Sequence, residues 1–198
     1  MYSKTLEELI FNIPYGEFEV RALSLDLDTS PQKLRFCIDD VLNTDERIVI
    51  TLETDQFVDF YISPNSSDYL SFEQNHPLLW DHNEAQCDLF ISGALNGHED
   101  GITYKLFMHH HYLYGKYCPF DPSISNRIKN RKFIHKGSKR LLDEWAEIFR
   151  SFGINATVVG GEEHHNDTKA TILFFGESYV ITRNYTETIE IIANRYSE

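Results

Sequence analysis

Residues 16–62 carry the apolar pattern that most constrains how this chain can fold. Apolar side chains recur there at steps of two to four, and the pattern breaks at residues 28–31. Two short helices joined by a tight turn would place these side chains on one inner face. Ser30 can accept hydrogen bonds from the free amides of the second helix, and Pro31 suits its first position, which needs no donor. The recurring residues are Phe18, Val20, Leu23, Leu27, Leu34, Ile38, Val41 and Leu42. We therefore expect a helix on each side of this turn, the second over about residues 31–43.

Two runs rich in β-branched and aromatic residues follow this pair of expected helices. They cover residues 47–52 and 57–62, and the polar residues between them predict a hairpin. A further helix is expected over residues 3–12, with Ser3 or Thr5 as its cap. In this order the stretch resembles a winged helix-turn-helix module whose wing is the hairpin. The resemblance covers less than a third of the chain, and it implies a shape rather than a partner.

The expected module offers a candidate DNA-binding face. In winged-helix proteins the second helix of the motif enters the major groove with its N-terminal residues, which here include Gln32, Lys33 and Arg35. Residues 1–62, however, hold five basic and thirteen acidic residues, a net charge of −8. Such a surface is repelled by phosphate, so docking to another protein is favoured for this module. A sequence-specific DNA-binding regulator, acting as a homodimer, is the alternative.

The composition of the whole chain predicts a soluble protein with packed cores. The 198 residues carry a formal net charge of −13 at pH 7, and 41% of them are hydrophobic. No apolar run approaches the roughly 20 residues that a bilayer crossing needs, and the first residues lack the apolar centre of a signal peptide. The three cysteines are too few for a disulfide framework. We expect a cytoplasmic protein with no membrane partner.

One short segment reverses the sign of the charge. Residues 127–140 hold seven basic residues and no carboxylate. Such clustering predicts a surface that binds phosphate or an acidic partner. The alternative is a basic loop that neutralises the acidic surface of the protein itself. The seven cations are Arg127, Lys129, Arg131, Lys132, Lys136, Lys139 and Arg140.

The polar, turn-rich residues 63–68 predict a domain boundary. The expected fold class is α+β: an N-terminal winged-helix module over residues 1–64, followed by an α+β domain with an antiparallel sheet over residues 65–198. Alternation and β-branched content predict the strands of the second domain, and an apolar stripe at helical spacing predicts its helices. The expected strands cover residues 85–92, 102–114, 154–159, 170–175 and 179–183, and the expected helices cover residues 138–152 and 186–194.

Three consecutive histidines, at residues 109–111, lie inside the second of these strands. On a regular strand His109 and His111 would point to one face, a geometry that suits two zinc ligands. The further ligands would have to come from His82, His98, Asp100 and Cys118. A half-exposed strand face without a metal is favoured over this site, so no cofactor is expected and zinc is the alternative. For His164 and His165 a solvated loop is expected.

No familiar catalytic motif occurs in the chain, neither a nucleophile elbow nor a zinc-protease helix nor a dinucleotide-binding glycine pattern. We therefore predict a non-enzymatic regulatory or interaction protein with a strongly acidic surface. Such a surface is attracted to a basic groove, so the expected partner is a protein that handles nucleic acid, which this chain would bind or inhibit. A nucleic-acid mimic fits the total charge, but the basic segment counts against a fully mimetic surface. The rivals are the DNA-binding regulator and a metal-dependent enzyme that uses His109 and His111.

Overall fold

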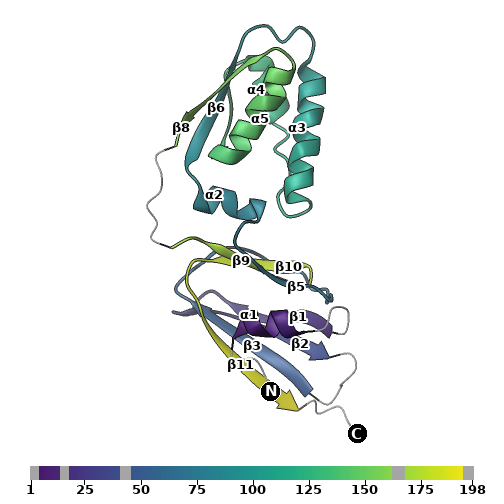
Figure 1. Cartoon of the computed structure of the whole chain (residues 1–198), viewed down its shortest axis with the longest axis vertical. Coiled ribbons are helices and arrows are strands. Elements are labelled where there is room, and N and C mark those ends of the chain that lie inside the picture. The colour runs from purple at the N-terminus through teal and green to yellow at the C-terminus, as the bar shows by residue number, and fades with distance from the viewer. Residues whose placement is uncertain (1–4, 14–17, 41–45, 162–167, 194–198) are drawn as a thin grey trace. The chain divides into compact units, whose positions relative to one another are not determined.

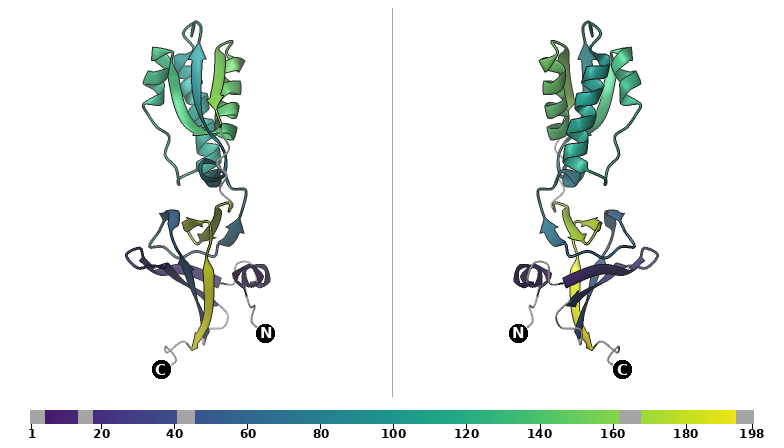
Figure 2. Two further views of the ribbon diagram at one scale, coloured as in Figure 1. Left: turned by 90° about the vertical axis from the view of Figure 1, so that its left-hand side faces the viewer. Right: turned by 90° about the vertical axis from the view of Figure 1, so that its right-hand side faces the viewer.

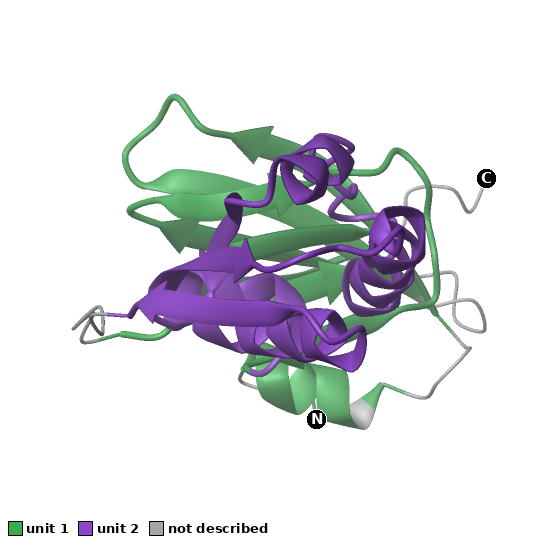
Figure 3. Ribbon diagram, turned by 90° about the horizontal axis from the view of Figure 1, so that it is seen from above, with its two compact units in different colours: residues 1–74, 168–198 green, residues 75–167 purple. Residues whose placement is uncertain are grey.

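The computed structural model describes residues 5–13, 18–40, 46–161 and 168–193. The chain divides into two compact units (Figures 1 and 3): unit 1 is formed by residues 1–74 and 168–198, and unit 2 by residues 75–167. Unit 2 is thus inserted between two strands of unit 1, β5 (Leu70–Glu73) and β9 (Thr171–Phe175). This division differs from the predicted boundary at residues 63–68, because strands near the C-terminus complete the sheets that the N-terminal strands begin.

Unit 1 consists of two four-stranded antiparallel sheets and a helix, α1 (Leu6–Asn12). The first sheet has the order β1-β2-β3-β11, and Figures 1 and 2 show β11 alongside β3. Its strands are β1 (Phe18–Asp26), β2 (Gln32–Asp40), β3 (Glu46–Thr54) and β11 (Thr186–Ala193). The second sheet has the order β4-β10-β9-β5, in which β4 spans Phe57–Tyr61 and β10 spans Ser178–Thr182.

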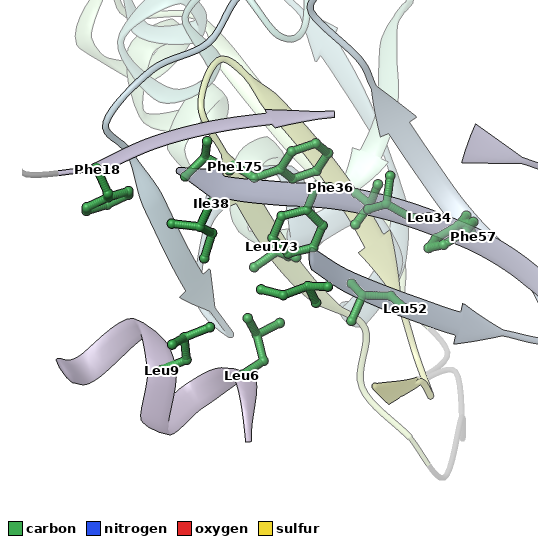
Figure 4. Packing of buried hydrophobic residues seen from close by; sticks show 13 residues of the cluster. Leu6, Leu9, Phe18, Leu34, Phe36, Ile38, Leu52, Phe57, Leu173 and Phe175 are labelled. Atoms are coloured by element: carbon green, nitrogen blue, oxygen red, sulfur yellow. The ribbon is translucent and has the colours of Figure 1, made fainter. Parts of the chain in front are cut away.

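Both sheets and α1 contribute side chains to one hydrophobic core (Figure 4). Phe36 on β2 stacks on Phe175 on β9 with their ring centroids 5.2 Å apart, which joins the two sheets directly. Each fully buried apolar side chain of this kind stabilises the fold by roughly 1.5–3 kcal/mol. The buried members are Leu6, Leu9, Phe18, Val20, Leu34, Phe36, Ile38, Ile50, Leu52, Phe57, Leu173, Phe175 and Val180. The helix expected over residues 3–12 is confirmed for Leu6–Asn12, with Thr5 as its cap, and Ser3 lies outside the described residues.

The prediction of two helices on either side of residues 28–31 is wrong. The turn exists, but it joins the antiparallel strands β1 and β2. Leu34, Phe36 and Ile38 are buried at alternate positions of β2 and face alternate residues of β3, so the apolar period is two. If the same residues formed a helix, Leu34 and Ile38 would lie on its inner face and Phe36 on its outer face. The described residues of this region therefore form strands where the expected module has its two helices, and Val41 and Leu42 lie outside the described residues.

The predicted hairpin and the predicted closing helix are also corrected. Residues 47–52 and 57–61 do form strands, but β3 pairs with β2 and β11 whereas β4 pairs with β10 in the other sheet. Residues 186–194 were expected to form a helix, and β11 occupies residues 186–193 instead. Five of its eight residues are threonine or isoleucine, and such β-branched side chains suit a strand.

Unit 2 contains a three-stranded antiparallel sheet with the order β7-β6-β8. Its elements are η1 (Pro77–Leu79), α2 (Trp80–Asn83), β6 (Gln86–Ser92), α3 (Glu99–Tyr114), α4 (Ile124–Asn130), β7 (Phe133–Ser138), α5 (Lys139–Ser151) and β8 (Asn155–Gly160). Helix α5 packs on all three strands, and α3 packs on α4 and α5. The strands face the viewer in one panel of Figure 2 and the helices in the other, so the long helices cover one face of this sheet. The expected strands at residues 85–92 and 154–159 and the helix at residues 138–152 are confirmed.

The strand expected over residues 102–114 is helix α3. Its buried residues are Ile102, Leu106, His110 and Tyr114, and this spacing of four places them on one helical face. The segment at residues 127–140 is likewise no loop, because it comprises the end of α4, the whole of β7 and the start of α5. With helices and antiparallel sheets in both units, the fold class is α+β. None of the described helices combines the length and the apolar character that a membrane crossing would need.

Candidate functional site

The residues expected at the start of a recognition helix lie on strand β2. Gln32 is part of the framework: its Nε2 donates to the carbonyl of Leu27 at 3.1 Å, and its Oε1 accepts from the N–H of Phe57 at 2.8 Å. Lys33 Nζ lies 2.6 Å from Glu53 Oε1. Arg35 is exposed. The prediction that these residues form the end of a groove-reading helix is therefore wrong.

Three of the seven cations in residues 127–140 are held by contacts within the protein. Arg127 pairs with Asp121 Oδ2 at 3.1 Å and also donates to the carbonyl of Ile134 at 3.0 Å. The other two are near the start of α5. Lys139 pairs with Asp143 at 2.5 Å, and Arg140 lies 3.8 Å from Glu144 and stacks over Trp80 at 4.3 Å.

The other four cations are exposed, and none of them forms an ion pair with a residue that the structure describes. They are Lys129, Arg131, Lys132 and Lys136, which we call the unpaired cations. Lys129 lies in α4 and Lys136 in β7, while Arg131 is the C-cap of α4 in a left-handed conformation. They follow one another along α4, the two residues after it and β7, so they can act together on an extended anionic partner more readily than on a single phosphate.

The histidines proposed as zinc ligands do not share a face. Successive residues of a helix are rotated by about 100°, so His109 and His111 point to nearly opposite sides of α3. His109 Nε2 lies 2.9 Å from Glu144 Oε2, and His111 stacks on Phe107 with the centroids 6.1 Å apart. Among the described residues, no group of three or more histidine, cysteine, aspartate or glutamate side chains is arranged to hold a metal ion. His164 and His165 lie outside the described residues.

The middle histidine, His110, is the buried one, with only 6% of its surface exposed. Its Nε2 lies 2.9 Å from the carbonyl oxygen of Cys118. Its ring is 4.6 Å from that of Tyr114, 5.6 Å from Phe120 and 6.1 Å from Trp145. Burial among these rings lowers the pKa of His110 below its usual value, so the imidazole is neutral at pH 7.

Several buried polar atoms of unit 2 have no hydrogen-bond partner in the described part of the chain. They are Trp80 Nε1, His109 Nδ1, His110 Nδ1, Tyr114 Oη and Trp145 Nε1. Native proteins pair most buried polar atoms with protein, water or ligand groups. Of these five atoms, the one on His110 belongs to a side chain that lines a cavity, together with the loop that follows α3.

Unit 1 carries a separate concave surface at the ends of its strands. Turns between β1 and β2, between β3 and β4, and between β10 and β11 border an open cleft of about 340 Å³. We call it the acidic cleft, and its lining residues are Ser30, Pro31, Glu53, Thr54, Asp55, Asn184, Tyr185 and Thr186. Asp26 and Asp28 lie in or beside the same β1–β2 turn, and both are exposed. Lys33 neutralises Glu53, whereas Asp26, Asp28 and Asp55 form no ion pair with a described residue.

Helix α3 also exposes large apolar side chains. We call them the α3 stripe: Tyr104, Phe107, Met108 and Tyr112, which are 63%, 44%, 46% and 86% exposed. Their spacing of three and four residues places them on neighbouring turns of one side of the helix. An apolar stripe of this kind on the surface is typical of a region that contacts another molecule.

The sequence interpretation missed His110 and the acidic cleft for different reasons. The recurrence of Ile102, Leu106, His110 and Tyr114 every four residues is visible in the sequence and could have identified both the helix and the buried histidine. The cleft combines turns separated by more than 120 residues, so no local pattern could reveal it.

We compared the chain with protein-family models, with curated proteins and with solved structures, and none of the three comparisons gave a match.

Proposed function

We propose that this chain is a non-enzymatic interaction protein that regulates or inhibits a basic partner protein, one that handles nucleic acid. The observation that carries this proposal is the unequal charge of the two units. Unit 1 contains 8 basic and 19 acidic residues, a net charge of −11, whereas unit 2 contains 10 basic and 12 acidic residues, a net charge of −2. Such a concentration of negative charge accelerates association with a positively charged partner.

The acidic cleft supplies a place where a basic side chain could bind. Asp55 lines it, and Asp26 and Asp28 lie in or beside the β1–β2 turn. These three exposed carboxylates form no ion pair with a described residue, although Asp26 lies opposite Lys33 in the pairing of β1 with β2. A lysine or arginine of a partner that lies in this open cleft of about 340 Å³ would be close to these carboxylates. Proteins that bind nucleic acid present such side chains in rows, and that is why they are the favoured class of partner.

The α3 stripe favours a protein as the partner. Tyr and Met side chains are enriched at the centres of protein interfaces, and a stripe without carboxylates suits a partner surface that is apolar at its centre. Unit 2 can therefore add contacts that do not depend on charge.

The acidic cleft can be tested with a synthetic peptide rich in lysine and arginine as the probe. We expect the triple variant Asp26→Asn/Asp28→Asn/Asp55→Asn to bind it more weakly by about tenfold, because three exposed ion pairs of roughly 0.5 kcal/mol each are lost. Fluorescence anisotropy of the labelled peptide at two salt concentrations gives the affinities.

The matched control removes three carboxylates from unit 2 by the variant Asp88→Asn/Asp100→Asn/Glu147→Gln. It changes the net charge of the chain equally but leaves the acidic cleft intact, so we expect less than a threefold loss of affinity. An equal loss in both variants would show that the peptide responds to net charge alone, and the cleft would then have no role.

A second candidate function, binding of nucleic acid, rests on the unpaired cations. Four exposed cations without described ion-pair partners, in a unit of net charge −2, provide a surface for phosphates even though the whole chain is acidic. If they contact duplex DNA, the variant Lys129→Gln/Lys132→Gln should reduce the slope of log affinity against log salt by about 2. The control variant Arg35→Gln/Lys169→Gln removes two exposed cations of unit 1 and should leave that slope unchanged. The absence of a gel shift at low salt would reject this candidate.

A further inference from the structure

The sheet of unit 2 has one face that the long helices cover and one face that they leave open (Figure 2). Cys87, Leu89 and Ile91 of β6 are buried, and α5 packs on this strand. Asp88 and Phe90 alternate with them, so they point to the other face. Phe90 is 39% exposed, which shows that this other face is open to solvent. We call this side of β6, β7 and β8 the open sheet face.

Two phenylalanines of neighbouring strands meet on the open sheet face. Phe90 of β6 is paired with Phe133 of β7, and their ring centroids lie 5.8 Å apart with the planes at 63°. Phe133 is 37% exposed. Because the planes are steeply inclined, a flat ring that stacks on one phenylalanine cannot also stack on the other. Each phenylalanine can therefore hold a separate flat group.

The third strand leaves room beside these rings. Thr157 of β8 lies opposite Phe90 and is exposed. Val159 lies opposite Asp88 and is 52% exposed. Both side chains are small and neutral, so a flat group on Phe90 meets no charge from β8.

Positive charge lies next to the two rings. Lys136, one of the unpaired cations, is exposed and is paired with Asp88 in the register of β7 with β6, so both residues share the open sheet face. The guanidinium carbon of Arg127 lies 5.7 Å from the centre of the Phe133 ring. In the described strands β6, β7 and β8, Asp88 carries the one carboxylate.

Two more unpaired cations adjoin the same strand. Arg131 and Lys132 directly precede Phe133 in the chain. The carbonyl of Lys132 accepts a hydrogen bond of 3.1 Å from the N–H of Ile91, so Lys132 continues the pairing of β7 with β6. Phe133 thus has unpaired cations before and after it along the chain, in a unit whose net charge is only −2.

This combination of aromatic rings and cations fits single-stranded nucleic acid. Bases stack on exposed aromatic side chains, and phosphates pair with lysine and arginine. In a duplex the faces of the bases are stacked on one another, so the two rings could not reach them. An apolar protein surface would leave the cations without a partner, and a purely acidic surface would leave the rings without one.

We propose that the open sheet face binds single-stranded nucleic acid, with one base on Phe90, one base on Phe133 and a phosphate at Lys136. This assignment deepens the second candidate function, on which it rests, by naming the form of the nucleic acid and the residues that hold it. It is independent of the acidic cleft, because the two surfaces belong to different units.

The form of the nucleic acid can be tested on the whole wild-type chain. The probe is a labelled oligothymidylate of about 12 nucleotides, within the roughly 4–16 nucleotides that a single-strand-binding domain covers. We expect fluorescence anisotropy at low salt to show that it binds at least about tenfold more tightly than a duplex of the same length. An oligouridylate of equal length serves as the RNA probe; the tighter of the two single strands identifies the source, and either supports the proposal.

The same titrations separate the failure of this assignment from the failure of the function on which it rests. A duplex that binds as tightly as the single strand would overturn the open sheet face as the site but leave the second candidate function standing. An absence of binding by every probe at low salt would reject both.

A double variant links binding to the two rings. Phe90→Leu/Phe133→Leu removes the aromatic faces but keeps apolar side chains in the strands, and we expect it to bind oligothymidylate about tenfold more weakly because stacking is lost. The matched control Phe11→Leu/Phe60→Leu removes two exposed phenylalanines of unit 1, which are 89% and 40% exposed, and should cost less than about threefold. Equal affinities of the two variants would overturn the proposal.

A single variant tests the phosphate contact. Lys136→Gln should reduce the slope of log affinity for oligothymidylate against log salt by about 0.7, the value of one phosphate contact in a single strand. The control Lys105→Gln removes an exposed cation of the same unit from α3 and should leave the slope unchanged. A slope that Lys136→Gln does not change would contradict the phosphate at this residue.

Photo-crosslinking locates the bases in the wild-type chain, so it decides even if the double variant does not fold. With 5-iododeoxyuridine in the oligonucleotide, we expect mass spectrometry to find crosslinks on the peptides that contain Phe90 and Phe133. Crosslinks confined to other peptides would overturn the proposal. So would a free chain that binds no oligonucleotide and sediments as a dimer that Phe90→Leu/Phe133→Leu dissociates, because a second copy would then cover the face.

Discussion

Asp81 Oδ1 accepts a hydrogen bond of 2.7 Å from the backbone N–H of Ser138. Asp81 lies in α2, near the start of unit 2, whereas Ser138 ends β7 and caps α5 through its side chain. Ser138 is fully buried, so its N–H has no access to water. The contact therefore joins segments 57 residues apart at the point where the sheet of unit 2 passes into its most amphipathic helix.

Replacement of Asp81 by alanine should destabilise unit 2. The buried N–H of Ser138 would lose a charged acceptor, which costs about 1–3 kcal/mol of the free energy of unfolding. The two tryptophans of the chain, Trp80 and Trp145, both belong to unit 2, so urea denaturation followed by tryptophan fluorescence reports on this unit. The control Asp88→Ala removes a carboxylate from the same unit and should change the free energy by less than about 0.5 kcal/mol. Equal losses would show that Asp81 acts only through its charge.

Unit 2 should lose stability as the pH falls below neutrality, and two histidines should contribute to that loss. Burial lowers the pKa of His110 and of His135 below the value of about 6.5 that each has in an unfolded chain. At pH values between the folded and the unfolded pKa, these two histidines bind more protons in the unfolded chain than in the folded one. Their contribution to the free energy of unfolding is therefore complete above about pH 6.5 and declines as the pH falls through the folded pKa. The groups that act on them include Asp81, Asp121, Arg127, His109 and His111.

The variant His110→Gln/His135→Gln isolates this effect from the titration of the carboxylates. We expect its free energy of unfolding, followed by tryptophan fluorescence, to fall less than that of the wild type between about pH 8 and about pH 5. His98→Gln, at an exposed position of unit 2 and not among the groups that act on His110 or His135, serves as the control and should follow the wild type. If the free energy of unfolding fell equally with pH in the wild type and the double variant, this would contradict the conclusion that burial lowers the pKa of the two histidines.

The elements that the sequence predicted correctly are those whose local pattern agrees with their place in the fold. Helix α5 has an apolar stripe, a serine cap and a glycine that follows its end, and β9 and β10 are short apolar runs joined by a glycine turn. In β2 the local pattern is ambiguous, because its apolar residues fit periods of two and of four. β2 is a strand because it pairs with β3 on one side and with β1 on the other. Such pairing is a tertiary effect, and the helix and strand propensities of single residues do not predict it.

The site residues were harder to predict than the fold. The cations at residues 127–140 were identified by type, but Asp121, Asp143 and Glu144, which neutralise three of them, became apparent only with the folded structure. For the histidines, the choice of strand over helix selected His109 and His111 as a pair and set His110 aside. In a helix the middle residue is the one that shares a face with Leu106, and it is therefore the buried one.

Truncation of Phe36 should unfold unit 1 far more readily than truncation of an aromatic residue at its surface. Phe36 is fully buried and stacks on Phe175 across the two sheets, so Phe36→Ala should lower the free energy of unfolding by about 3–5 kcal/mol. Phe60 is 40% exposed, and Phe60→Ala should cost less than about 1.5 kcal/mol. Because unit 1 contains no tryptophan, hydrogen exchange of the β2 and β9 amides is the suitable measurement. Similar losses for the two variants would contradict the shared core.

The two units should also differ in whether they fold as isolated fragments. A fragment of residues 1–64 would be complete if it were a winged-helix module, but the structure predicts that it stays unfolded. It lacks β9, β10 and β11, so β3 and β4 lose partners and the core loses Leu173, Phe175 and Val180. A fragment of residues 75–167 contains every strand and helix of unit 2 and should fold alone.

Far-UV circular dichroism and the dispersion of amide NMR signals test both fragments. We expect a cooperative thermal transition for residues 75–167 and none for residues 1–64. As a control for the length of the fragment, residues 1–74 joined directly to residues 168–198 restore the eight strands that the structure describes in unit 1 and should recover a cooperative transition. A folded 1–64 fragment would mean that the N-terminal strands do not need the C-terminal ones, since the hydrogen bonds of β3 to β11 and of β4 to β10 would then be dispensable.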